Sequence, residues 1–133
     1  MRFSTPILTA FALTLSLSPV QAANHTKSMS MAVKTVKTSK GEVLADAKGM
    51  TLYTFDKDKK GVSNCNGGCA KKWPPLIAAA KAKAYGEYSI IKRADGTMQW
   101  AYEGKPLYSW FKDKKPGDVT GDGVKGVWHL AKH

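Results

Sequence analysis

The chain has 133 residues and a formal net charge of +11, because its 21 lysines and arginines outnumber its 10 aspartates and glutamates. This length allows one domain with a modest core and excludes two large domains. The positive charge favours anionic partners, although the lysines are scattered along the chain as solvating residues are. No glycine-rich phosphate loop, Gly-x-Ser-x-Gly or His-Glu-x-x-His sequence occurs, which excludes three common signatures of catalytic sites.

Residues 1–22 have the pattern of a secretory signal. Arg2 precedes an apolar stretch from about Pro6 to Leu17, and small residues end the segment at Ala22. The apolar stretch is too short to span a membrane. We therefore predict cleavage near Ala22, export to a bacterial periplasm or beyond, and a mature chain without a transmembrane segment. Such a protein would meet anionic components of the cell envelope, and we expect no nucleic-acid partner.

Residues 23–31 are polar or small and have no hydrophobic period, which predicts a flexible arm. His25, Met29 and Met31 lie in this arm, and imidazole and thioether groups suit Cu(I) in an exported protein. The sequence leaves open whether the arm binds copper or is a plain leader.

Three short strands are predicted after the arm. Val33–Val36 alternates with β-branched residues, and Glu42–Asp46 and Met50–Phe55 follow it after glycine-containing turns. Connections this short make neighbouring strands antiparallel. This part of the chain is therefore predicted to form a small β-meander.

The chain then repeats itself with an offset of 55 residues. Equivalent pairs are Val36 and Ile91, Gly41 and Gly96, Gly49 and Gly104, Leu52 and Leu107, Tyr53 and Tyr108, Phe55 and Trp110, Asp58 and Asp113, and Trp73 and Trp128. The matched turn glycines predict positive φ. A single three-stranded meander cannot bury its apolar face. We predict an all-β fold with minor short helices, in which two tandem β-meander repeats pack about a pseudo-twofold axis.

A single domain is predicted over 32–133, with repeats at 32–76 and 87–131. The connector at 77–86 contains an alanine-lysine run that predicts about two helical turns. A further short helix is predicted at 68–73.

Cys65 and Cys69 are the only cysteines, and a close, even pair in an exported chain indicates a disulfide. The closed loop is small, so its expected stabilisation is at the low end of the range, about 2 kcal/mol. A redox dithiol and a copper-binding pair are the alternatives.

The second copy carries a different loop. Asp118, Thr120, Asp122 and Gly123 occupy positions 1, 3, 5 and 6 of a calcium-loop pattern. His129 replaces the bidentate glutamate expected at position 12, so an ordinary turn rich in Asp and Gly competes with calcium. Calcium and copper are candidates, and no cofactor is firmly predicted.

The tyrosine and the aspartate of each copy, Tyr53 with Asp58 and Tyr108 with Asp113, are candidates for a hydrogen-bonded pair. Such a pair suits proton transfer, and an enzyme using Tyr108 and Asp113 is one alternative. Chemistry seldom needs the same set twice in a small domain, so a structural role is favoured. The residues given that role are Tyr53, Asp58, Trp73, Tyr108, Asp113 and Trp128.

Aromatic residues gather in the second copy. Strand alternation places Trp100 and Tyr102 on one face. Together with Trp110 they are a candidate face for stacking on flat ligand rings.

The doubled Tyr-x-(Phe/Trp/Tyr)-x-x-Asp motif resembles the secreted repeat family of predicted bacterial lipoproteins. Further matching stretches are Ser63-Asn64-Cys65, Gly68-Cys69-Ala70, Trp73-Pro74-Pro75, Asp95-Gly96, Gly104 to Tyr108, Pro116-Gly117-Asp118 and Trp128-His129. The resemblance implies an exported repeat domain and no established reaction. Many members look lipid-anchored, whereas the signal segment here has no cysteine.

The sequence therefore predicts an exported, non-catalytic binding or accessory protein. The alternative is a metal-binding or thiol redox protein that uses Cys65 and Cys69 or the loop at 118–123.

Overall fold

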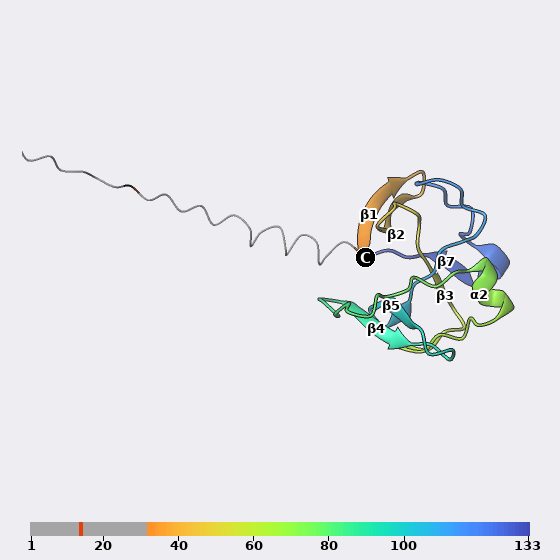
Figure 1. Ribbon diagram of the computed structural model, residues 1–133. Helices are drawn as coiled ribbons and strands as arrows, with labels where there is room; N and C mark the ends of the chain where they lie inside the picture. The colour runs from red at the N-terminus through yellow and green to blue at the C-terminus, as the bar shows by residue number, and fades with distance from the viewer. Residues whose placement is uncertain (1–13, 15–31) are drawn as a thin grey trace, which may run out of the picture.

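The computed structural model describes residue 14 and residues 32–133 (Figure 1). In chain order the elements are β1 (Val33–Thr38), β2 (Gly41–Asp46), β3 (Tyr53–Phe55), α2 (Gly68–Lys72), β4 (Tyr88–Lys92), β5 (Met98–Tyr102), β6 (Lys105–Pro106), the 3-10 turn η1 (Val124–Gly126) and β7 (Trp128–Leu130). The strand pairs are antiparallel, which confirms the all-β fold with minor helices. The predicted signal segment, arm and copper ligands His25, Met29 and Met31 lie outside the described residues.

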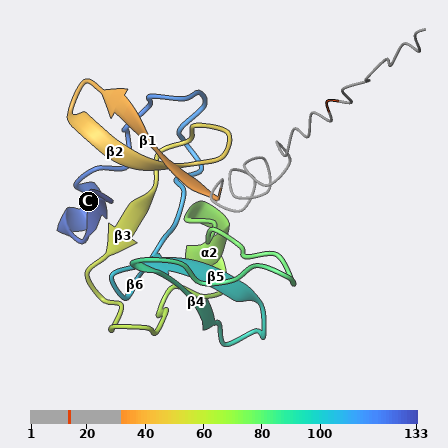
Figure 2. The ribbon, with the colours of Figure 1, turned by 90° about the vertical axis from the view of Figure 1, so that its left-hand side faces the viewer.

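Each repeat begins with an antiparallel hairpin. β1 pairs with β2, and β4 pairs with β5 at the equivalent positions. Gly41 and Gly96 turn the two hairpins with φ of 97° and 89°, a region that glycine enters without a steric penalty. Figure 2 shows the two hairpins on opposite sides of β3. The predicted positive φ at the matched turn glycines is thus confirmed.

The central strand of each repeat pairs with the other repeat. β3 lies beside β7, with Tyr53 opposite Leu130, and the equivalent bridge joins Tyr108 to Pro75. Tyr53 and Tyr108 also exchange two backbone hydrogen bonds of 2.7 and 3.0 Å. This reciprocal pair marks the pseudo-twofold axis. The two meanders are therefore intertwined, because the last segment of each repeat completes the other.

Two hydrophobic clusters fill the interior, and each draws side chains from both repeats. The aliphatic cluster contains Val33, Leu44, Leu52, Ala78, Trp100, Leu107 and Ala131. The aromatic cluster contains Tyr53, Cys65, Trp73, Tyr108, Trp110 and Trp128. Neither repeat has a core of its own.

The prediction of about two helical turns in the connector at 77–86 is wrong. Ile77 forms a β-bridge with Gln99, and the Ala78 N–H donates to the Met98 carbonyl at 2.9 Å. Ala78 is also buried in the aliphatic cluster. Pairing with β5 and burial override the helix propensity of alanine. The short helix predicted at 68–73 is confirmed as α2.

None of the helices in the described part of the chain is long and apolar enough to cross a membrane.

Candidate functional site

Four aromatic rings form one continuous stack across the pseudo-twofold axis. The order is Phe55, Trp128, Trp73 and Trp110, with centroid distances of 4.2, 3.7 and 3.9 Å between neighbours. The two central tryptophans are equivalent residues, as are Phe55 and Trp110 at the two ends. The stack therefore repeats the symmetry of the backbone. Rings stacked in this way cover one another's faces, so other neighbours meet the central tryptophans at their edges.

The stack is packed tightly by its neighbours. Tyr53 meets Trp73 edge to face at 5.4 Å, and Tyr108 meets Trp128 in the same way at 5.2 Å. A Cβ atom on Gly121 would lie 2.9 Å from Trp73 and 3.0 Å from Tyr53. Rigid rings cannot move away from such a contact, so glycine is needed here for space.

A cleft of about 470 Å³ opens over this stack, and we call it the stack cleft. Its apolar lining combines the four stacked rings with Cys69 of α2 and with Val124 and Val127 around η1. Cys69 and Val124 are equivalent in the two repeats, so the cleft lies over the pseudo-twofold axis. Its charged lining breaks the symmetry: Lys57, Lys72 and Lys125 are exposed there, and no acidic residue of the described part of the chain lines it.

The tyrosine–aspartate pairs exist, but the pairing predicted within each copy is wrong. The Tyr53 hydroxyl donates to Asp113 Oδ2 at 2.6 Å, and the Tyr108 hydroxyl donates to Asp58 Oδ2 at 2.7 Å. Each phenol thus bonds to the carboxylate of the other repeat. The reason is the exchange of strands, which places the central strand of one repeat beside the loop of the other.

The Tyr53–Asp113 pair is fully enclosed. Asp113 Oδ1 accepts the backbone N–H and the hydroxyl of Thr120 at 3.0 and 2.6 Å, and the Gly121 N–H donates to the Tyr53 oxygen at 3.1 Å. Burial, together with the Asp113 carboxylate, raises the pKa of Tyr53 far above its usual range. A neutral phenol with satisfied partners holds the loop in place, which fits the predicted structural role.

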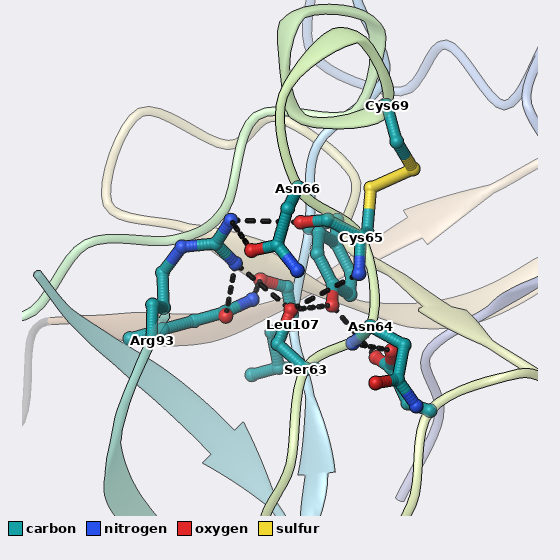
Figure 3. Close-up of a disulfide and its surroundings, with 10 residues drawn as sticks. Ser63, Asn64, Cys65, Asn66, Cys69, Arg93 and Leu107 are labelled. Carbon is teal, nitrogen blue, oxygen red and sulfur yellow. Dashed lines mark hydrogen bonds between the residues drawn. A yellow bond between two sulfur atoms is a disulfide. The ribbon is translucent and has the colours of Figure 1, made fainter. Parts of the chain in front are cut away.

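The Tyr108–Asp58 pair leads through Ser63 to a buried arginine, Arg93, and Figure 3 shows Arg93 beside Ser63. The Ser63 hydroxyl lies 2.7 Å from that of Tyr108, and Arg93 Nη1 donates to Ser63 at 2.9 Å. Arg93 also donates to Gln99 Oε1 at 2.8 Å. Only 5% of Arg93 is exposed, and the chain Arg93–Ser63–Tyr108–Asp58 connects its charge to a carboxylate through two hydroxyls. Hydrogen bonds of this kind make burial of a guanidinium tolerable.

Sequence reasoning missed Arg93. The one available signal is that Arg93 is the only arginine after Arg2 in a chain rich in lysine. A guanidinium presents several N–H donors in a fixed plane, which suits a buried site where a lysine would not serve.

Cys65 and Cys69 form a disulfide, as predicted, with 5.2 Å between their Cα atoms (Figure 3). Cys65 is fully buried, and its carbonyl accepts a hydrogen bond from Arg93 Nη2 at 2.7 Å. The disulfide therefore holds the segment that surrounds Arg93.

The three residues of the calcium pattern bond to three different groups. Asp118 Oδ2 accepts the N–H groups of Lys114 and Lys115, Thr120 donates to Asp113, and Asp122 pairs with Lys40 at 3.1 Å. Among the described residues, no group of three or more His, Cys, Asp or Glu side chains could hold a metal ion. Calcium binding stays a prediction.

The predicted ligand face of Trp100, Tyr102 and Trp110 is not one surface. Trp100 is 4% exposed and belongs to the aliphatic cluster, whereas Trp110 ends the aromatic stack. Tyr102 is half-buried and packs against the aliphatic cluster. Strand alternation correctly places Trp100 and Tyr102 at the same cluster. The sequence could not show that Trp110 belongs to the other cluster.

Titration of Asp58 gives a testable consequence. Burial raises the pKa of Asp58 above the 3.8 of a free aspartate. The folded state therefore keeps this proton to a higher pH than the unfolded state, so the stability contributed by Asp58 is greatest below pH 3.8 and is lost as the pH rises through the raised pKa. Relative to Asp58→Asn, the wild type is expected to lose free energy of unfolding over this window in urea titrations at a series of pH values.

Asp118→Asn is the matched control with the opposite sign. Hydrogen bonds from the Lys114 and Lys115 N–H groups lower the pKa of Asp118, so its contribution is present above pH 3.8 and is lost as the pH falls. A difference curve for Asp58→Asn that is flat, or that slopes like the Asp118→Asn curve, would contradict the assignment.

A family model described as a secreted repeat of unknown function matches residues 34–77 and again residues 89–132. The chain belongs to this family. The two matches together cover more than half of the chain and confirm the resemblance carried by the doubled motif. No curated protein and no solved structure matches the chain. Membership makes this a protein of a secreted family, and it brings no reaction, ligand or partner with it.

Proposed function

We propose that this chain is an exported, non-catalytic binding protein and that the stack cleft holds an organic anion. The observation that carries this proposal is the lining of the cleft: the edges of stacked rings, three lysines and no acid. Ligand pockets in proteins combine a mostly apolar lining with a few polar groups that fix orientation.

The stacked rings themselves favour an anion. Trp73 lies between Trp110 and Trp128, and Trp128 lies between Phe55 and Trp73, so the faces of the central rings are occupied. The part of Trp73 and Trp128 that lines the cleft is therefore ring edge, which carries the positive part of the ring quadrupole. A sugar or a cation needs a free ring face, whereas a carboxylate, sulfonate or phosphate attached to an apolar group fits edges and lysines together.

The arrangement of the acid–phenol pairs supports binding rather than catalysis. The two tyrosines and two aspartates bond to one another across the repeats, and none of the four lines the stack cleft. The same set occurs twice because the fold needs it twice. Among the described residues, the lining of the cleft then includes neither a carboxylate nor a phenol.

Anionic components of the cell envelope are the proposed source of the ligand. A secreted family and a positive net charge support an encounter with them. We propose delivery to the periplasm, with cleavage after Ala22. Mass spectrometry of the protein from the periplasmic fraction tests this directly, because the mature N-terminus is expected at Ala23.

The lysines provide the test of the site. Titration with naphthoate, followed by calorimetry, is expected to show binding that weakens with salt. Replacing Lys57, Lys72 and Lys125 together by glutamine is expected to weaken binding about ten-fold, because each exposed charge contact contributes about 0.5 kcal/mol.

The control variant replaces three exposed lysines that do not line the cleft, Lys37, Lys81 and Lys92, by glutamine. It makes the same change in net charge and is expected to bind naphthoate as the wild type does. The proposal fails if the control loses as much affinity, or if neutral naphthalenemethanol binds as tightly as naphthoate.

A metal or thiol redox function is the second candidate. Cys69 is partly exposed and lines the stack cleft, so a thiolate formed there by reduction would meet a ligand. A free-thiol count and metal analysis of the periplasmic protein test this: reduced cysteines with stoichiometric copper support it, and oxidised cysteines without metal overturn it.

A further inference from the structure

A second cleft lies at the other hydrophobic cluster, between the beginning of β1 and the beginning of β4. Tyr85, Tyr88 and Tyr102 form a row along it, with ring centroids 5.0 and 4.9 Å apart and planes tilted by 32° and 45°. All three rings are half-buried. The cleft has a volume of about 430 Å³, and it shares no residue with the stack cleft. We call it the tyrosine cleft.

Two carboxylates lie beside the tyrosine row. Glu87 lines the cleft, and the Glu103 N–H donates to the Glu87 carbonyl at 2.9 Å. The Glu103 carboxyl is close enough to raise the pKa of Glu87. Among residues 32–133 the close contacts between basic and acidic side chains join Lys40 to Asp122 and His129 to Asp56, so neither glutamate forms a salt bridge there. Two like charges side by side favour a cation between or above them.

The tyrosines stay neutral at physiological pH. Burial, with Tyr85 and Tyr102 nearby, raises the pKa of Tyr88 to about 12. Neutral phenol rings keep the negative ring face that attracts a cation, and Tyr102, at the end of the row, contacts Tyr88 alone among the aromatic rings of residues 32–133.

We propose that the tyrosine cleft binds an organic ammonium group. Weakly hydrated ammonium groups with alkyl substituents suit aromatic walls, since they pair apolar contact with attraction to the ring faces, and the two carboxylates supply the opposite charge. A hard metal ion would instead need several converging oxygen ligands. Lys34 also lines the cleft, so we expect the ammonium group on the side of Glu87, away from this lysine. This inference is independent of the anion proposed for the stack cleft.

Choline chloride is the probe, titrated into the exported chain and followed by NMR. Choline is expected to bind with millimolar affinity, and its neutral tert-butyl analogue is expected to bind at least about five-fold more weakly, because it has the same shape without the charge. Equal affinity for choline and for its neutral analogue would overturn the proposal. So would the absence of choline binding at concentrations on the order of tens of millimolar, where a weak site would be occupied.

Variants separate the rings from the carboxylates. Choline binding is expected to weaken about five-fold in Tyr102→Leu and also in the double variant Glu87→Gln, Glu103→Gln. Tyr102→Phe keeps the ring, so its affinity for choline is expected to stay within roughly two-fold of the wild type. Phe111→Leu, at an exposed aromatic outside the tyrosine cleft, is the control and is expected to change nothing. Thermal unfolding confirms that each variant is folded, and the glutamine variant, made at exposed positions, tests the site even if Tyr102→Leu is unstable.

Vesicles of phosphatidylcholine distinguish the source of the group. Binding to free choline alone indicates a small solute, and binding to both indicates a lipid headgroup. Wild-type affinity for choline in the glutamine variant would show that the carboxylates play no part and would overturn the inference.

Discussion

Each repeat prepared alone, as residues 32–86 or residues 87–133, is expected to be unfolded. The reason is the exchange of strands: β3 of the first repeat pairs with β7 of the second, and both hydrophobic clusters contain side chains of both repeats. A separated repeat would expose half of each cluster and an unpaired central strand, and such a fragment cannot bury enough apolar surface to offset its conformational entropy. Circular dichroism with thermal melting is the measurement.

Mixing the two fragments is the control for this experiment. The mixture is expected to regain the near-ultraviolet signal of packed tryptophans, since the interface between the repeats is the core itself. Cooperative melting of either fragment alone would show that the repeats are independent units and would contradict the intertwined fold.

Trp73→Ala is expected to lower the free energy of unfolding by about 3–5 kcal/mol, the range found for large aromatic residues removed from cores. Trp73 is 4% exposed, stacks on Trp110 and Trp128, and presents its edge to Tyr53. The substitution therefore leaves a cavity at the centre of the stack that rigid neighbours cannot fill. Urea unfolding followed by circular dichroism measures the loss.

Phe111→Ala serves as the matched control on the same surface. Phe111 is 43% exposed and touches the stack through one edge contact with Trp110 at 4.9 Å. Its removal is expected to cost less than about 1 kcal/mol, since little apolar area is uncovered. Equal losses for the two variants would mean that the stack does not hold the repeats together.

The offset of 55 residues predicted much of the fold, because a duplicated meander has to bury its face against its copy. It could not predict the partners of the tyrosines. Tyr53 is equivalent to Tyr108, and Asp58 to Asp113, whether each phenol bonds within its own repeat or across the axis. Both arrangements have the same sequence pattern, so only the three-dimensional pairing of β3 with β7 decides between them.

The sequence could not predict the stack cleft either, because its lining residues come together only in the folded chain. Its three lysines come from three segments: Lys57 follows β3, Lys72 ends α2, and Lys125 lies in η1. Nothing in their spacing distinguishes them from the many solvating lysines of the chain. The helix predicted for the connector at 77–86 was wrong for a different reason. Its alanines satisfy a local helix pattern, but contacts with β5, which is distant in sequence, determine its structure.

The indole N–H resonances of the four tryptophans report directly on binding at the stack cleft. Three of these side chains, Trp73, Trp110 and Trp128, line the stack cleft, and Trp100 lies in the other cluster as an internal control. When naphthoate is titrated into nitrogen-labelled protein, the three stack resonances are expected to shift with one common affinity while that of Trp100 stays in place. A shift of Trp100 alone, or no shift of the three at saturating naphthoate, would contradict binding at the stack cleft.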